Sequence, residues 1–223
     1  IVSIFVNPTQ FNNRNDYKKY PRNIKKDLKI LKNLKVNFVY MPDKNQIYSS
    51  INRVKIHLKK KDKILCAKHR KGHFEGVIDV MTRLTKLVKP SKIFMGEKDF
   101  QQLLLVKRFI EKKFKSKIIS CKTIRDKNKL ALSSRNLHLN KKDLIKAGKI
   151  TKEIISFKKR LSKKKISKKF ILEKKKEIEK NYNINIEYLE MRNYKNLHIS
   201  NKINNSKMFI AYYLNKIRLI DNF

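Results

Sequence analysis

One expected strand-to-helix turn, residues 96–99, has side chains suited to holding a ligand that carries a phosphate group. It follows a short apolar run and precedes a helix expected over 103–114. In an open α/β sheet, ligands bind at the carboxyl ends of strands, where such turns lie. The ammonium of Lys98 suits a phosphate group, and Gln102 offers a neutral amide for a hydroxyl or carboxylate. The chain has only four glycines, so Gly96 indicates a backbone that a ligand approaches closely. The candidate residues in the turn are Gly96, Glu97, Lys98 and Asp99.

A second polar segment places two hydroxyl groups beside a guanidinium. Ser133, Ser134 and Arg135 together suit a polyphosphate, with the serines donating and the arginine bridging oxygens. A helix cap is the alternative, in which Ser134 or Asn136 starts the next helical turn. No His and acid are arranged recognisably around these serines, so a serine nucleophile is not indicated.

Asn7 and Gln10 follow the first apolar run, residues 1–6, which we expect to be a buried strand. Their side-chain amides would bind carboxylates and hydroxyls without a change of charge. The alternative is a turn with a polar cap, because Asn-Pro is a common turn sequence.

A dense polar loop, residues 65–76, contains Cys66, His69 and His73 at a spacing seen in zinc sites. A structural zinc site needs four ligands, however, and no second ligand pair lies nearby. We therefore interpret the loop, which also carries Arg70 and Glu75, as part of an active site. A basic surface loop is the alternative.

Alternating strands and helices must position these residues. The alternation predicts a parallel sheet covered by helices, and hence an α/β, Rossmann-like domain over residues 1–122. A smaller α+β domain is expected over 123–223. The expected strands of the first domain are 1–6, 36–41, an edge strand near 54–58, 93–95 and 117–123. Three helices are expected: one that begins at Pro21, one over 77–87 and one over 103–114.

The second domain is expected to contain two helices and two stretches of strand. Helical spacing predicts one buried helix face with Ala147, Ile150, Ile154, Phe157 and Leu161, and another with Ile171 and Ile178. Strands are expected over 184–191 and 207–220, and the lysine runs 163–165 and 174–176 are interpreted as solvated surface.

The net charge of +40 raises the question of nucleic-acid binding. Lysine is abundant along the whole chain together with Asn and Ile, which indicates biased composition instead of a dedicated binding face. No apolar run approaches the roughly 20 residues that span a bilayer. Two cysteines form no disulfide framework, so a reducing, cytoplasmic location is expected.

Several motifs together resemble one enzyme family over essentially the whole chain. In order and spacing, they are similar to those of pantothenate synthetase (pantoate–β-alanine ligase, AMP-forming). The motifs are 1–11 (IVSIFVNPTQF), 20–22 (YPR), 65–76 (LCAKHRKGHFEG), 94–103 (FMGEKDFQQL) and 132–136 (LSSRN), with closing segments 188–192 (YLEMR) and 218–222 (RLIDN).

The resemblance implies a nucleotidyltransferase-like fold and a reaction in two steps. The carboxylate of pantoate attacks the α-phosphate of ATP, giving pantoyl adenylate and pyrophosphate. The amine of β-alanine then releases AMP and forms pantothenate, in coenzyme A biosynthesis. The resemblance further implies Mg²⁺ with the ATP, no metal site built from protein side chains, and a cytoplasmic homodimer without a dedicated nucleic-acid or membrane partner.

Family roles carry over to matching positions of this chain. Lys98 and Arg135 are the expected catalytic residues, and Gln10, Gln102 and Asn7 are expected to hold pantoate or β-alanine. The expected ATP-binding residues are Gly96, Glu97, Lys98, Asp99, Ile124, Leu132, Ser133, Ser134 and Arg135.

Departures from the family pattern define the alternatives. The family's His-x-Gly-His motif is not found in this chain, so we expect it, with the first βα unit, upstream of Ile1. Lys129 and the turn Asn215-Lys216 stand where the family usually has glycine. An impaired remnant of the enzyme and a basic nucleic-acid-binding protein are the alternatives. A nucleic-acid-binding protein would have aromatic residues interleaved with the lysines. In this chain most Phe and Tyr residues fall instead at expected core positions or within the motifs.

Overall fold

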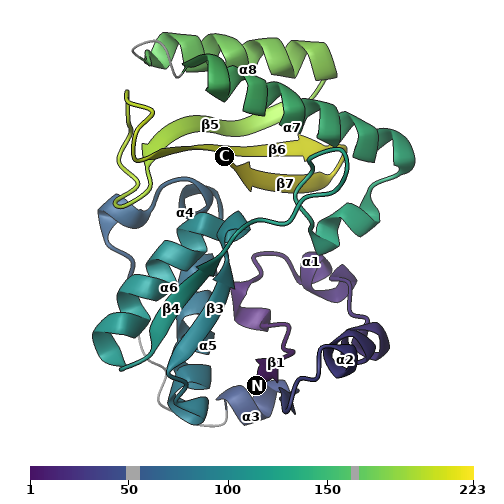
Figure 1. The fold of residues 1–223 in the computed structure, drawn as a ribbon, viewed down its shortest axis with the longest axis vertical. Helices are drawn as coiled ribbons and strands as arrows, with labels where there is room; N and C mark the ends of the chain where they lie inside the picture. Colours follow the sequence, from purple (N-terminus) through teal and green to yellow (C-terminus); the bar gives the residue numbers. More distant parts are fainter. Residues whose placement is uncertain (49–55, 162–165) are drawn as a thin grey trace. The chain divides into compact units, whose positions relative to one another are not determined.

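Short parallel strand pairs, joined by helices, form the first part of the chain (Figure 1). The computed structural model describes residues 1–48, 56–161 and 166–223. Strand β1 (Val2–Ser3) pairs in parallel with β2 (Val39–Tyr40). Strand β3 (Lys92–Gly96) pairs with β4 (Lys117–Cys121), and helix α6 (Phe100–Lys113) connects them as a βαβ unit. The predicted α/β class is confirmed.

The chain divides into two compact units, and each is described by itself. The first contains Ile1–Ile93 and Leu105–Ile118, and the second contains Phe94–Leu104 and Ile119–Phe223. The chain therefore passes between the units within β3, α6 and β4. The candidate turn 96–99 belongs to the second unit by its contacts, and the domain boundary at residue 122 stays a prediction.

Local signals set the ends of the helices in the first unit. Asn23 caps α2, and Gly72, with φ +78°, allows the chain to turn into α5 four residues before the predicted start. Helix α5 ends just before Pro90. The helices of this unit are η1 (Pro8–Gln10), α1 (Arg14–Lys19), α2 (Ile24–Asn33), α3 (Lys44–Tyr48), η2 (Lys60–Asp62), α4 (Cys66–His69) and α5 (His73–Val88).

The prediction of a buried strand over residues 1–6 is wrong. Only two residues form β1, Ile1 is 62% exposed, and the apolar side chains at 2 and 4–6 are only partly covered. The physical reason is that β1 has β2 as its one hydrogen-bonded neighbour in the described chain. The expected edge strand is also wrong where it can be seen: Ile56 and Leu58 are not in a strand, and Val54 lies outside the described residues.

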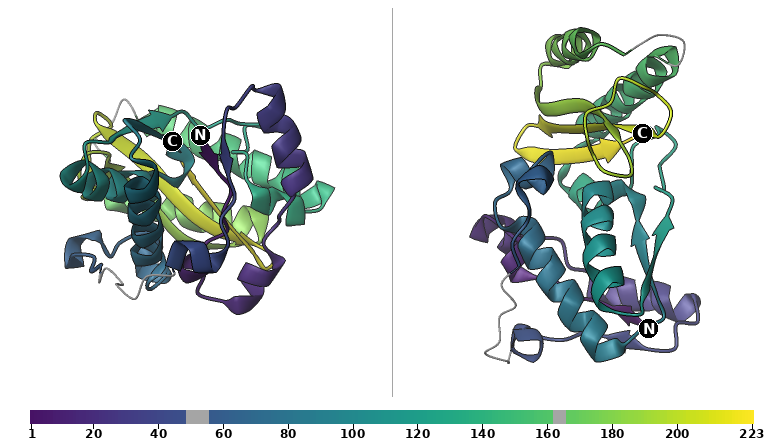
Figure 2. Two further views of the ribbon diagram at one scale, coloured as in Figure 1. Left: turned by 90° about the horizontal axis from the view of Figure 1, so that it is seen from below. Right: turned by 90° about the vertical axis from the view of Figure 1, so that its left-hand side faces the viewer.

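The second unit contains a three-stranded antiparallel sheet covered on one face by two helices (Figures 1 and 2). Strand β6 lies between β5 and β7, with Ile210 opposite both Leu189 and Asp221. A tight turn at Asn215, with φ +52°, joins β6 to β7. The elements are η3 (Glu97–Asp99), η4 (Ser134–His138), α7 (Lys141–Leu161), α8 (Lys168–Tyr182), β5 (Asn185–Asn193), β6 (Ser206–Leu214) and β7 (Ile217–Asn222).

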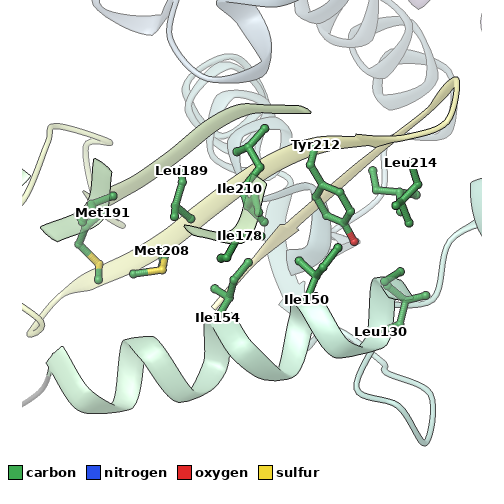
Figure 3. Close-up of a cluster of buried hydrophobic side chains, with 14 of the residues drawn as sticks. Leu130, Ile150, Ile154, Ile178, Leu189, Met191, Met208, Ile210, Tyr212 and Leu214 are labelled. Carbon is green, nitrogen blue, oxygen red and sulfur yellow. The ribbon is translucent and has the colours of Figure 1, made fainter. Parts of the chain in front are cut away.

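The core of this unit lies between α7, α8 and the sheet (Figure 3). Ile150 and Ile154 of α7 and Ile178 of α8 are fully buried, as the helical spacing predicts. Met208 and Ile210 of β6 meet them from the sheet. Each such side chain contributes roughly 1.5–3 kcal/mol when it leaves water.

The prediction that residues 174–176 are solvated is wrong for Lys174. This side chain is 5% exposed, and its Nζ lies 2.6 Å from Glu153 Oε1 and 2.8 Å from Glu177 Oε1. Lys174 is three residues from Ile171 and four from Ile178, so it shares their buried face of α8. The other run, 163–165, lies outside the described residues.

Glu153 carries the charge that balances Lys174 between α7 and α8. Burial raises the pKa of Glu153, but hydrogen bonds from Lys174 and Tyr182 hold the pKa below its usual value. Burial, followed by the hydrogen bond to Glu153, raises the pKa of Tyr182 to about 12. The stabilisation from the Glu153 carboxylate is therefore complete above its unfolded pKa, and is lost as the pH falls through its lower folded pKa.

We expect Lys174→Met to lower the free energy of unfolding by about 1–2 kcal/mol at neutral pH, because the carboxylate of Glu153 loses its cation. The difference from the unsubstituted protein should shrink at an acidic pH below the lowered folded pKa of Glu153, where this carboxylate becomes protonated. Urea denaturation at both pH values measures this. Lys169→Met, at a side chain that is 83% exposed, is the control and should change little. An equal loss at both pH values would refute the role of the ion pair.

Candidate nucleotide and substrate sites

The turn between β3 and α6 presents an open backbone at Gly96. Gly96 has an ordinary φ of −71°, and a Cβ atom added there would meet no atom within 4 Å. Neither backbone conformation nor packing in the described chain therefore requires glycine at this position. The open space agrees with the prediction that a ligand approaches the backbone here.

We expect Gly96→Ala to leave stability unchanged or to raise it by up to about 1 kcal/mol, because alanine fits this backbone and restricts the unfolded chain. Binding of a nucleotide should weaken, since the methyl group occupies the space beside the turn. Thermal denaturation and the KM for ATP measure the two effects. Gly148→Ala is the opposite control: its Cβ would lie 2.7 Å from Asn128 Cβ, so stability should fall. An unchanged KM for ATP in Gly96→Ala would remove this turn from the site.

The last strand, β7, is hydrogen-bonded to the backbone of the turn 96–99. Asn222 Nδ2 of β7 donates hydrogen bonds to Glu97 O at 2.8 Å and Lys98 O at 3.0 Å. The Glu97 carboxylate lies 3.3 Å from Lys207 Nζ of β6. Glu97, an expected ATP-binding residue, thus uses its side chain and its carbonyl within the protein.

Lys98 is a partly buried cation with little local compensation. Its side chain is 19% exposed, and its Nζ lies 3.9 Å from Asp99 Oδ1, which is its shortest ion pair within the described ranges. Burial raises the pKa of Asp221, and Arg125, Asn222 and finally Lys98 oppose that rise. Lys98 thus lies near β7, and its ion pair with Asp99 is long.

Gln102 follows Lys98 by one helical turn, in the first turn of α6. Its side chain is half-buried and makes no hydrogen bond within the described part of the chain. Residues four apart on a helix lie on the same side. The amide of Gln102 is therefore available beside the cation of Lys98.

The second predicted segment is folded as a hairpin followed by the short helix η4. Leu132 N donates to Ile124 O at 2.9 Å, so these two expected ATP-binding residues lie side by side, with exposed side chains. Ser133 caps η4 by accepting from Arg135 N at 3.3 Å, so the capping residue is Ser133 and not Ser134 or Asn136. Lys129, at the tip, has φ +69°, in the left-handed region that favours glycine.

Strand β7 brings the two predicted nucleotide segments together. Asn222 holds Glu97 and Lys98, while Arg218 O accepts a hydrogen bond from Arg135 Nη1 at 3.4 Å. Four residues along a strand span about 13 Å. The segments of Lys98 and Arg135 therefore lie along one strand, at a separation that a nucleotide spans.

Asn7 and Gln10 lie in the first unit, on the turn that contains η1. Asn7 is 2% exposed; its Nδ2 donates to Gly76 O at 3.0 Å, and its Oδ1 accepts from Tyr48 OH at 2.7 Å. Its amide therefore shapes the turn from inside the protein. Gln10 is half-buried, and its side chain makes no hydrogen bond to any described residue. Of the two predicted amides, Gln10 is the one available to a substrate.

The polar loop at 65–76 holds the backbone of Gln10. His73 Nδ1 donates to Gln10 O at 2.8 Å, and Arg70 Nη1 lies 2.9 Å from His73 Nε2. Because both ring nitrogens of His73 have partners, this ring is not placed to bind zinc. The described residues contain no group of three or more His, Cys, Asp or Glu side chains that would hold a metal ion.

Sequence reasoning missed three residues that organise these sites. Tyr48 holds Asn7, Asn222 holds the 97–98 turn, and Arg125 forms two hydrogen bonds of 2.6 and 2.9 Å to Asp221. The one available signal was Asp221-Asn222, a polar pair at the end of an apolar strand.

No helix among the described residues is long and apolar enough to cross a membrane.

Comparisons with known proteins agree over the whole chain. A family model described as pantoate-beta-alanine ligase matches residues 1–223. A pantothenate synthetase of Francisella tularensis subsp. mediasiatica is 37% identical, with all of this chain covering 78% of that protein.

Solved structures give the same result. A pantothenate synthetase from Thermus thermophilus superposes with a TM-score of 0.91 at 29% identity, covering all of this chain and 82% of the other. A pantoate-beta-alanine ligase from Francisella tularensis, solved as a complex with beta-gamma ATP and beta-alanine, gives a TM-score of 0.82 at 36% identity. It matches all of this chain, which covers 77% of that one.

Proposed function

This chain belongs to the pantoate–β-alanine ligase family, and from that premise we propose that it joins pantoate to β-alanine at the expense of ATP. One observation within the chain carries the proposal: Lys98, a partly buried cation whose ion pair with Asp99 is as long as 3.9 Å, lies beside the open backbone of Gly96. Family membership favours this function over a nucleic-acid-binding role.

In the first step, a carboxylate oxygen of pantoate forms a bond to the α-phosphorus of ATP. The bond from that phosphorus to the bridging oxygen breaks, and pyrophosphate leaves with the electron pair. Negative charge gathers at the phosphorus and on the leaving group. Lys98 and Arg135 supply the positive charge that stabilises this negative charge. Hydrogen bonds to strand β7 hold the segments of both residues.

In the second step, the free amine of β-alanine attacks the acyl carbon of pantoyl adenylate. The bond from that carbon to the phosphate oxygen breaks, AMP leaves, and the amine loses a proton as the amide forms. Gln102 in the second unit offers a neutral amide that matches the hydroxyl groups and carboxylate of pantoate, and Gln10 in the first unit offers another. Asn7, buried beneath the turn, keeps Gln10 in place.

Mg²⁺ fits this proposal as a companion of the nucleotide. Magnesium commonly uses one or two carboxylates together with substrate phosphates, and Asp99 offers an exposed carboxylate next to Lys98. When bound, the ion neutralises phosphate charge. We further place the enzyme in the cytoplasm as a homodimer; the free cysteines Cys66 and Cys121 are compatible with a reducing compartment. Light scattering in solution tests the dimer.

The test uses the protein expressed from its complete reading frame. AMP and pantothenate should form together, in equal amounts, only when ATP, pantoate and β-alanine are all present. Replacing β-alanine with other amines at the same concentration should reduce AMP release strongly. Continuous AMP release without β-alanine, or equal release with any amine, would overturn the assignment. A folded protein that makes no pantothenate would favour the alternative of an inactive remnant.

A further inference from the structure

Asn222 is buried at the end of β7 and makes an uncommon pair of contacts. It is 4% exposed, and both hydrogens of its amide are used on consecutive carbonyls, Glu97 O at 2.8 Å and Lys98 O at 3.0 Å. Its Oδ1 is buried and has no hydrogen-bond partner among the described residues. A buried amide kept with one unpaired oxygen is costly, so its donors must serve a purpose that an apolar residue does not.

The surroundings of Asn222 fix its position independently of the turn. Asp221 accepts two hydrogen bonds from Arg125, and Arg125 Nη2 also donates to Asn222 O at 3.1 Å. Asn222 is paired with Phe209 in the sheet, and the ring of Phe209 lies 5.9 Å from that of Phe100, the first residue of α6. The amide is therefore presented by a rigid strand.

The two hydrogen bonds of Asn222 act on the peptide groups that follow Glu97 and Lys98, and the orientation of these groups matters for phosphate binding. With its carbonyls at 97 and 98 directed towards Asn222, the turn cannot rotate these peptide groups without losing two hydrogen bonds. The N–H groups of Lys98 and Asp99, which belong to these two peptide groups, and the direction in which the Lys98 side chain leaves the backbone are thus fixed. Backbone N–H groups before a helix are suited to anions.

We propose that Asn222 is a positioning residue for the first step, which fixes the 97–98 peptides so that Lys98 meets the ATP phosphates. This rests on the proposed function. Asn222 touches no substrate in this proposal, and its effect passes through Lys98. Removing the amide should therefore weaken the use of ATP and leave the KM for β-alanine unchanged.

The experiment is a double-mutant cycle with Asn222→Ala and Lys98→Ala. We expect Asn222→Ala to lower kcat/KM for ATP by at least about tenfold, the range for a displaced catalytic group. In the Lys98→Ala background, the same change should cost less than about twofold, because coupled residues are not additive. A full effect in both backgrounds would overturn the proposal, since it would show a role independent of Lys98.

Controls separate positioning from folding. Asn193→Ala, at the end of β5, removes an asparagine that accepts a hydrogen bond from Lys195 N, and should leave kcat/KM for ATP unchanged.

If Asn222→Ala does not fold, Asn222→Asp preserves the volume but lacks the two donors. Its activity relative to the unsubstituted protein should rise at lower pH, as the introduced carboxyl gains a proton to donate. A ratio independent of pH in a folded Asn222→Asp protein would overturn the proposal. If the unsubstituted protein makes no pantothenate, the proposed function fails; if it does and Asn222→Ala matches Asn193→Ala, this inference alone fails.

Discussion

Replacing Lys98 with alanine should lower kcat by about 10²–10³-fold, the effect of removing one preorganised charge donor from a transition state. The side chain is largely buried, and its nearest anion, Asp99 Oδ1, is 3.9 Å away. Its charge is therefore poorly compensated until a phosphate arrives. Folding should be little affected, because the ion pair with Asp99 is long and half-exposed, and Arg125 remains as the main partner of Asp221. Stability is expected to change by less than about 0.5 kcal/mol.

A lysine on the exposed face of α8 provides the control that distinguishes a localised phosphate site from an effect of overall charge. Lys168→Ala removes the same charge from a chain of net charge +40, but at an exposed position. Steady-state rates of AMP formation, with ATP varied at saturating pantoate and β-alanine, measure both variants. The rate of Lys168→Ala should stay within about twofold of the unsubstituted protein, as expected for a screened surface charge. Similar losses in the two variants would mean that overall charge, and not a localised site, binds the nucleotide.

Much of the second unit was predictable because local rules and packing agree there. The spacing of Ile150 and Ile154 in α7 and of Ile178 in α8 follows one buried face, and the structure buries all three completely. The turn 96–99 was predicted as a nucleotide site for a similar reason, and that assignment stays a prediction. A glycine and a lysine between a strand and a helix combine backbone freedom and charge at the end of a strand.

Other features depend on partners far away in the sequence. Lys174 was assigned to the surface because a lysine run is usually solvated, yet Glu153, 21 residues earlier, provides the partner that makes its burial possible. Asn222 and Lys98 are 124 residues apart. Strand Ile1–Val6 was assigned to the interior by its apolar side chains, but a strand is buried only when neighbours cover it.

Gly76→Ala should damage the first unit, although alanine is the better helix former by about 1 kcal/mol. Gly76 lies in α5, and a Cβ atom there would be 2.6 Å from Thr9 O and 2.8 Å from Thr9 C. The carbonyl cannot move aside easily, since the turn is fastened at both ends. Asn7 donates to Gly76 O, and His73 donates to Gln10 O. Overpacking costs of about 1–3 kcal/mol should outweigh the gain in helix propensity, so a net loss of stability is expected.

The same displacement should reach catalysis through Gln10. If the turn moves to admit the methyl group, the amide of Gln10 shifts with it, and kcat/KM for pantoate should fall by at least about tenfold. Gly72→Ala is the matched control: its φ of +78° makes alanine unfavourable there by about 1–2 kcal/mol, but an added Cβ meets no atom within 4 Å. The control should lose comparable stability and keep its kcat/KM for pantoate. Equal catalytic losses in the two variants would show that general destabilisation, and not the position of Gln10, limits the reaction with pantoate.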